Sequence, residues 1–183
     1  FRFDQAPPIA LAALDSSERV VYLGSFSKTI FPGLRLGFGV LPERLMERVL
    51  ELKWFSDRCT PVLEQLALAD WLESGVFERH VRKMRSIYAR RRQTLLAALD
   101  RGFGERVRVG GVPAGMHVLA EFDLGLSASD LIARAADAGV GLYPVGDAAR
   151  RRRGPGRVVL GFGHLPEALI ARGIARLARA FTG

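Results

Sequence analysis

The chain has 183 residues, 49% of them hydrophobic, and its 27 lysines and arginines against 19 acidic residues give a net charge of +8. This composition is enough for one good core or two small ones. The lone cysteine, Cys59, excludes an internal disulfide framework and a zinc site made only of cysteines. No stretch reaches the roughly 18 apolar residues that a membrane helix needs.

The chain starts at Phe1 without an initiator methionine and without the apolar leader of a signal peptide. We therefore expect it to be part of a longer, cytoplasmic protein. The basic excess fits either an acidic partner or nucleic acid. Arginines spread over helix faces are more often solubilising, and we favour that reading of the charge.

Hydrophobic spacing predicts alternating strands and helices along the chain. The apolar run Val20–Leu23 has the length and composition of a buried parallel strand. Gly37, in the next strand, permits close approach to a ligand or to a neighbouring strand. Thr60 is expected to cap a helix, with Glu64 near the capping-box position. In order we expect strands over 19–24 and 35–41, helices over 42–55, 61–74 and 76–99, strands over 106–109 and 115–122, a helix capped by Ser127, strands over 140–145 and 157–163, and a helix opened by Pro166.

The loop over residues 25–34, after the first strand, carries the chemistry. Lys28 is the only lysine among the first fifty residues, and a lysine, unlike an arginine, can lose its proton and attack a carbonyl. Ser25 and Ser27 offer hydroxyl donors, and Arg35 offers a planar fork suited to a phosphate. This set suits pyridoxal phosphate, held as a Schiff base on Lys28. The alternative is a surface turn with a solvated lysine.

The pattern Ser-x-Ser-Lys-Thr-x-x-Pro-Gly-x-Arg-x-Gly over residues 25–37 resembles the lysine segment of fold-type I pyridoxal-phosphate enzymes. Its lysine-to-arginine spacing is similar to that of aminoadipate-type aminotransferases and of MocR/GabR-type transcriptional regulators. The resemblance implies that Lys28 holds the cofactor, that Ser25 and Arg35 bind its phosphate, and that Ser27 lies beside them. Further matching segments are 1–4, 60–65, 77–88, 115–118 and 160–165.

This resemblance implies an α/β fold, the C-terminal part of a fold-type I transferase. Residues 1–75 would be the end of the large cofactor domain, and 76–183 a linking helix with a small α+β domain. The family's glycine-rich phosphate turn, its ring-stacking aromatic residue, the aspartate for the pyridine nitrogen and the tyrosine facing the cofactor would all lie upstream of Phe1. We therefore expect that the chain alone is inactive and does not hold the cofactor stably.

A substrate-binding arginine is harder to assign. By the resemblance it would fall at Val159, which cannot bind a carboxylate. Arg157 lies two residues earlier on the same strand face and is a candidate, as are the arginines of the 150–153 loop. The alternative is that Arg157 only begins a strand. His80, His117 and His164 show no metal-ligand spacing, so we expect no metal site.

Two functions stay open from the sequence. The first is the effector domain of a MocR/GabR-type regulator, which would bind an amino acid or amine and reach DNA through a domain outside this chain. The second is a transaminase of the aminoadipate type, in which Lys28 also moves protons. Either would be a homodimer without membrane attachment. A basic nucleic-acid module is a third reading, but the chain lacks a recognisable motif for it.

Overall fold

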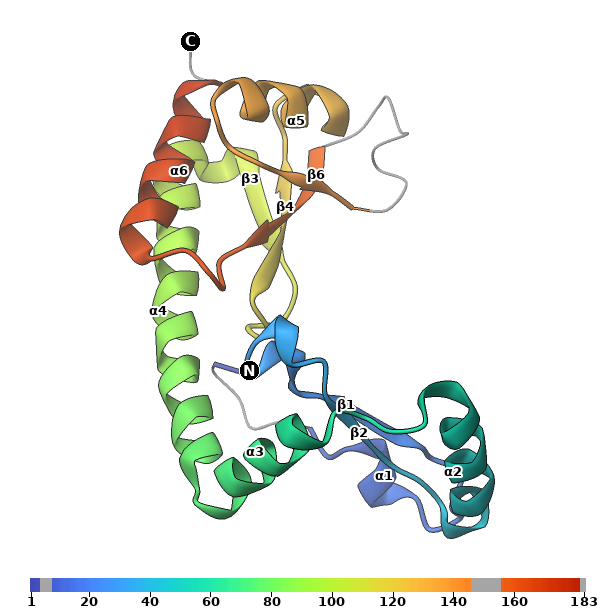
Figure 1. Ribbon diagram of the computed structural model, residues 1–183. Helices are drawn as coiled ribbons and strands as arrows, with labels where there is room; N and C mark the ends of the chain where they lie inside the picture. The colour runs from blue at the N-terminus through green and yellow to red at the C-terminus, as the bar shows by residue number, and fades with distance from the viewer. Residues whose placement is uncertain (4–7, 146–155, 182–183) are drawn as a thin grey trace. The chain divides into compact units, whose positions relative to one another are not determined.

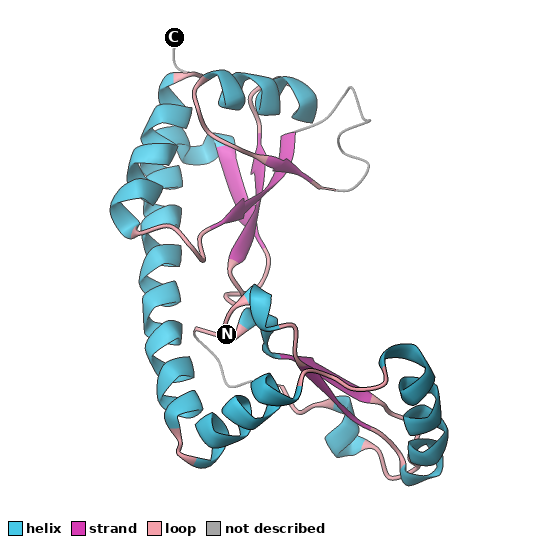
Figure 2. Cartoon of the chain, in the orientation of Figure 1, coloured by secondary structure: helices cyan, strands magenta, loops and turns pink. Residues whose placement is uncertain are grey.

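The structure is a computed structural model that describes residues 1–3, 8–145 and 156–181 (Figures 1 and 2). Its contacts form two compact units, one of Ala6–Lys83 and one of Phe1–Gln5 with Met84–Gly183. We call the first the lysine unit and the second the sheet unit. Their boundary falls within helix α4 (Val76–Phe103). The domain division at residue 75 stays a prediction about the complete protein.

A four-stranded antiparallel sheet of order β3-β4-β6-β5 is the centre of the sheet unit. The strands are β3 (Val107–Gly110), β4 (His117–Phe122), β5 (Tyr143–Pro144) and β6 (Gly156–Gly161). Alternation along β4 decides which side chains enter the core. Val118, Ala120 and Phe122 are buried, whereas His117 and Leu119 are exposed. The strand–strand–helix–strand–strand–helix order predicted for this region is confirmed, although β5 is shorter than expected.

Helices α4, α5 (Ala128–Asp137) and α6 (Glu167–Arg179) pack against this sheet (Figure 1). The Ser127 hydroxyl accepts a hydrogen bond from the Asp130 backbone N–H at 3.2 Å, which confirms the predicted cap of α5. Helices α4 and α6 lie side by side. A Cβ added at Gly102 would lie only 3.0 Å from the Cβ of Ala178, so glycine permits this close helix contact.

The core of the sheet unit joins buried side chains of α4, β4, α5, β6 and α6. Phe103 of α4 and Phe122 of β4 meet edge to face, with ring centroids 5.0 Å apart. Each large apolar side chain that is fully buried contributes about 1.5–3 kcal/mol. The N-terminal residues join this unit through Phe3, whose N–H donates to the Pro113 carbonyl at 3.0 Å. The largest fully buried side chains are Phe122, Phe162, Leu99, Leu131, Leu177 and Val158.

The lysine unit is a hairpin with helices and has little buried surface. It contains α1 (Leu11–Leu14), β1 (Tyr22–Ser25), the 3₁₀ turns η1 (Phe26–Lys28) and η2 (Pro32–Leu34), β2 (Gly37–Val40), α2 (Glu43–Asp57), α3 (Val62–Glu73) and the first turns of α4. Among the described residues, Leu36 and Pro42 are the only buried residues of this unit.

The prediction of a buried parallel strand at Val20–Leu23 is wrong for this structure. Strand β1 pairs antiparallel with β2, and Tyr22 and Leu23 are 41% and 75% exposed. The pairing is antiparallel because the chain returns directly alongside β1 after the lysine loop. The strand is exposed because no layer within the described part of the chain covers it. Its apolar composition therefore indicates a surface that needs a partner.

The predicted cap at Thr60 is also wrong. Helix α3 begins after Pro61, and no side chain caps it. The Thr60 hydroxyl instead accepts a hydrogen bond from Lys53 Nζ at 2.7 Å.

Asp15 fixes the segment that enters β1. Its carboxylate accepts hydrogen bonds from the backbone N–H groups of Ser17, Arg19 and Val20 at 2.9, 2.6 and 2.6 Å. These bonds, those from Ser17 and Val20 foremost, lower the pKa of Asp15 because they stabilise the charged form.

None of the helices in the described residues combines the length and apolar character needed to cross a membrane.

Candidate functional site

The loop between β1 and β2 presents the predicted site residues. The last ladder pair is Ser25 with Gly37, and the Phe26 N–H extends the ladder by donating to the Leu36 carbonyl at 3.1 Å. This closure returns the chain to β1 immediately after Arg35. Ser25, Ser27, Lys28 and Arg35 therefore lie at one end of a single hairpin.

Lys28 ends a tightly closed turn. The Phe26 carbonyl accepts hydrogen bonds from the N–H groups of Thr29 and Ile30 at 3.1 and 2.9 Å, and from the Thr29 hydroxyl at 3.2 Å. The Ser25 hydroxyl oxygen accepts from the Ser27 N–H at 3.3 Å. Because that hydroxyl acts there as an acceptor, its own proton stays available to a ligand.

Arg35 holds an unusual backbone conformation beside this turn. Its φ of 52° and ψ of 24° are left-handed, a region that side chains with a Cβ enter at a cost. Strained residues of this kind are concentrated at functional sites. Gly37 is required for a different reason: a Cβ there would lie 2.7 Å from the Gly24 carbonyl oxygen. The sequence allows Gly37 to permit close approach either to a ligand or to a neighbouring strand. The structure supports the second role, because the atom that a Cβ would meet belongs to β1.

The two cations of the loop have no partners among the residues that the structure describes. Lys28 and Arg35 are exposed, and their side chains form no hydrogen bond or ion pair with the residues that the structure describes. Lys53 differs, because its amine contacts Asp57 Oδ2 at 2.8 Å as well as the Thr60 hydroxyl. The amine of Lys28 is therefore free to react with a ligand, and Arg35 is free to bind an anion.

This donor set fits a phosphate ester that also carries an aldehyde. Hydroxyl groups and a guanidinium bind phosphate oxygens, and an amine bonds covalently to an aldehyde carbon. The hairpin end supplies all three kinds of group. The individual cofactor roles of Ser25, Ser27, Lys28 and Arg35 stay predictions.

Arg157 is paired within the protein. It lies opposite Glu121 in the β4–β6 ladder, and its Nε contacts Glu121 Oε2 at 2.6 Å. Arg108 reaches the other oxygen of the same carboxylate at 3.5 Å. This cross-strand pairing favours the interpretation that Arg157 stabilises the sheet. Its substrate-binding role stays a prediction, and the arginines at 150–153 lie outside the described residues.

His80 is a residue of this region to which the sequence assigned no role. It lies in the second turn of α4, and its Nε2 is 2.9 Å from the carbonyl oxygen of Thr29, directly after Lys28. Phe77, one helical turn earlier, contacts Phe26 edge to face. The spacing of Phe77 and His80 places both on one helix face. The sequence does not show that this face contacts the lysine loop.

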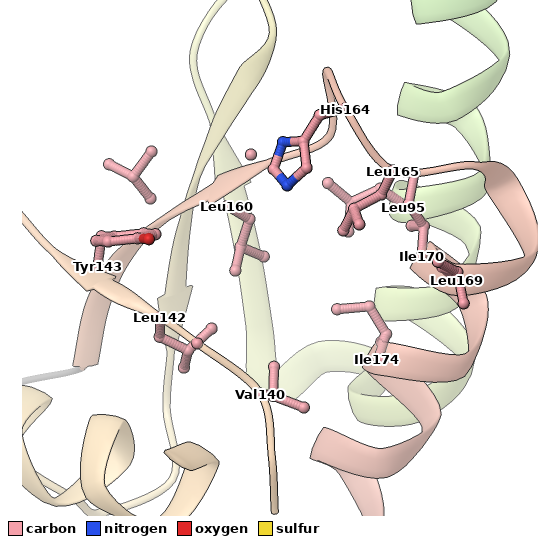
Figure 3. Close-up of a pocket in the computed structure, with 14 residues that line it drawn as sticks. Leu95, Val140, Leu142, Tyr143, Leu160, His164, Leu165, Leu169, Ile170 and Ile174 are labelled. Atoms are coloured by element: carbon pink, nitrogen blue, oxygen red, sulfur yellow. The ribbon is translucent and has the colours of Figure 1, made fainter.

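The sheet unit contains an apolar pocket of about 300 Å³. Figure 3 shows Leu142 and Leu160 from the strand side facing Ile170 and Ile174 of α6, with His164 at the rim. The pocket provides mainly apolar contact and no cluster of reactive groups, so we do not place the chemistry there. Within the described residues, no three His, Cys, Asp or Glu side chains gather as a metal ion would require.

Residues 2–158 match the model of the family described as aminotransferase class I and II. The chain belongs to this family. The predicted α/β fold, that of the C-terminal part of an aminotransferase, is therefore confirmed.

Both kinds of protein that the lysine loop resembles occur among the relatives. The chain is 36% identical to an uncharacterised HTH-type transcriptional regulator of Bacillus subtilis, YhdI, over 99% of this chain and 39% of that protein. It is 32% identical to the probable rhizopine catabolism regulatory protein MocR of Rhizobium meliloti, over 99% of this chain and 37% of that protein. The chain thus spans about two fifths of the length of these curated relatives.

The structure resembles that of LysN, the alpha-aminoadipate aminotransferase of Thermus thermophilus, solved in a complex with N-(5'-phosphopyridoxyl)-L-leucine. The TM-score is 0.84 at 34% sequence identity, and the match covers 100% of this chain and 47% of that chain. The resemblance predicted from the lysine loop is confirmed by these relatives.

Proposed function

We propose that the chain is the lysine-bearing part of an aminotransferase-like effector domain in a MocR-type transcriptional regulator, and that it binds pyridoxal phosphate covalently through Lys28. The observation that carries this proposal is the placement of Lys28 on a closed turn beside Ser25, Ser27 and Arg35, with both cations unpaired within the described part of the chain. The similarity to LysN, whose structure contains a phosphopyridoxyl amino acid, supports the choice of cofactor.

Each residue has a separate part in this proposal. Arg35 binds the phosphate through its planar fork of N–H donors. Ser25 and Ser27 donate hydroxyl hydrogens to the same group. Lys28, in its neutral form, would bond through Nζ to the aldehyde carbon, and the aldehyde oxygen would leave as water. When bound, pyridoxal phosphate supplies an electron sink for chemistry at amino groups.

A regulator uses this site to sense a small molecule. An amino acid or amine that competes with Lys28 for the cofactor shifts the equilibrium between two conformations of the protein. The shift would reach DNA through a domain outside these residues, in a homodimeric, cytoplasmic protein. The HTH-type regulator and MocR support this part of the proposal. The pairing of Arg157 with Glu121 also supports it, because that arginine is already neutralised.

The second candidate is a transaminase of the aminoadipate type. The likeness to LysN over the full length of this chain favours it. Here Lys28 would also carry a proton to and from the substrate carbon. The two candidates share the cofactor site and differ in whether amino groups are transferred repeatedly.

The test is to mix the full-length protein and pyridoxal phosphate with L-2-aminoadipate and other amino acids, with 2-oxoglutarate as amino acceptor. We expect an amino acid to change the cofactor absorption, with no more than about one oxo acid formed per site. The K28R variant should lose the absorption change, because a guanidinium does not react with the aldehyde. K83R is the matched control and should behave like the wild type.

Sustained formation of oxo acid over many turnovers would establish the transaminase and contradict the regulator. Binding of duplex DNA by the same protein, altered by the amino acid that changes the absorption, would support the regulator.

A further inference from the structure

We infer that His80 is a positioning residue for Lys28, holding the turn on which the lysine is presented. This inference rests on the proposed function of Lys28. His80 Nε2 lies 2.9 Å from the carbonyl oxygen of Thr29, the residue that follows the lysine. The two groups are 51 residues apart in sequence, so the bond fastens the loop to a separate element, helix α4.

The same helix face holds the other end of the turn. Phe77 contacts the ring of Phe26 edge to face, with centroids 5.8 Å apart and planes at 79°. Phe77 and His80 are three positions apart and so lie on one face of α4. Phe26 and Thr29 flank the pair Ser27–Lys28, and each has a contact to this face. The backbone of Lys28 is therefore held on both sides by α4.

The turn transmits this restraint to the lysine. The Phe26 carbonyl accepts hydrogen bonds from both the N–H and the hydroxyl of Thr29, at 3.1 and 3.2 Å. The Ile30 N–H, which shares a peptide group with the Thr29 carbonyl, also donates to the Phe26 carbonyl at 2.9 Å. Rotation of that peptide group would break this bond as well as the bond to His80. The side chain of Lys28 stays exposed and has no partner in the ranges that the structure describes. The structure thus fixes the base of the lysine and leaves its amine free, as preorganised binding requires.

The surroundings of His80 suit a fixed donor. Its ring is half-buried and lies 5.9 Å from the ring of Trp71, tilted by 47°, which restricts its rotation. To donate to Thr29, Nε2 must carry a hydrogen, which it does in the imidazolium and in one neutral tautomer. A side chain without that donor would leave a half-buried carbonyl unpaired and the turn less restrained.

The experiment compares two variants of the full-length protein. H80F keeps a ring against Trp71 but removes the donor, whereas H80Q places an amide N–H at about the distance of Nε2. We expect H80F to release pyridoxal phosphate about tenfold faster than the wild type, the order that one hydrogen bond allows. H80Q should restore release to within about twofold of the wild type. Release is followed by the cofactor absorption after an excess of a trapping amine is added.

A purely structural role would lower thermal stability equally in both variants without rescue by glutamine. If H80F does not fold, H80N takes its place, because its shorter amide does not reach Thr29. Wild-type release rates in H80F, or equal damage in H80F and H80Q, would overturn the inference. Failure of the wild type itself to bind the cofactor through Lys28 would instead contradict the proposed function, so the two failures are distinguishable.

Discussion

Arg35 combines a strained conformation with a proposed ligand contact. Its left-handed backbone is unfavourable for a residue with a Cβ by roughly 1–2 kcal/mol, yet its side chain has no partner among the described residues. No contact of the side chain with the described residues offsets this cost. A bound phosphate would offset it, and would explain why an arginine stands where glycine would fit best.

The R35G variant separates these two effects. Glycine adopts the left-handed conformation without strain, although it also adds freedom to the unfolded chain. We expect the free energy of unfolding of the cofactor-free full-length protein to rise by about 0.5–1 kcal/mol, and affinity for pyridoxal phosphate to fall at least tenfold. Urea unfolding and a cofactor titration measure these quantities.

R35A is the control, because it loses the guanidinium and keeps the strain. It should lose affinity as R35G does without the gain in stability. Unchanged cofactor affinity in both variants would contradict the proposed phosphate contact.

Lys28 could be found from the sequence and His80 could not, for a physical reason. Ser25, Ser27, Lys28 and Arg35 are close in sequence, so their residue types and spacing already predict a shared site. His80 acts through a contact across 51 residues, which depends on how α4 meets the loop. Arg157 shows a related limit, since its partner Glu121 is determined by strand register.

At the scale of elements, the helices and the sheet of the second unit follow from local signals. Alternation predicts β4, and the predicted cap at Ser127 is confirmed. The cap predicted at Thr60 is wrong because the N-cap of α3 is Pro61, one residue later. Strand β5 is only two residues long, although the apolar stretch around it predicts more. Local propensity does not contain these tertiary contacts.

At the scale of the whole molecule, burial is distributed unequally between the two units. Nearly all buried apolar side chains found in the described residues belong to the sheet unit, with Leu36 and Pro42 as the exceptions. The lysine unit exposes large apolar side chains on several elements, among them Leu23, Phe55 and Leu63, each at least 75% exposed. We expect this surface to be covered by further polypeptide in the complete protein.

Hydrogen exchange of the 183-residue chain tests this asymmetry. Amides of β4 and β6 should exchange at least about 100-fold more slowly than those of β1 and β2, because a buried core opens far less often than an uncovered hairpin. In the full-length protein the amides of β1 and β2 should become protected as well. Equal protection of the β1–β2 hairpin and the four-stranded sheet in the isolated chain would contradict the expectation that further polypeptide covers the lysine unit.

The central claim is that Lys28 holds the cofactor, and the most direct measurement locates that covalent bond. The full-length protein is incubated with pyridoxal phosphate, reduced with borohydride to trap the bond, digested and mapped by mass spectrometry. We predict about one cofactor per chain on the peptide that contains Lys28, none in K28R, and wild-type labelling in K53R and K83R. Labelling of Lys53 or Lys83 in place of Lys28, or undiminished labelling of K28R, would contradict the claim.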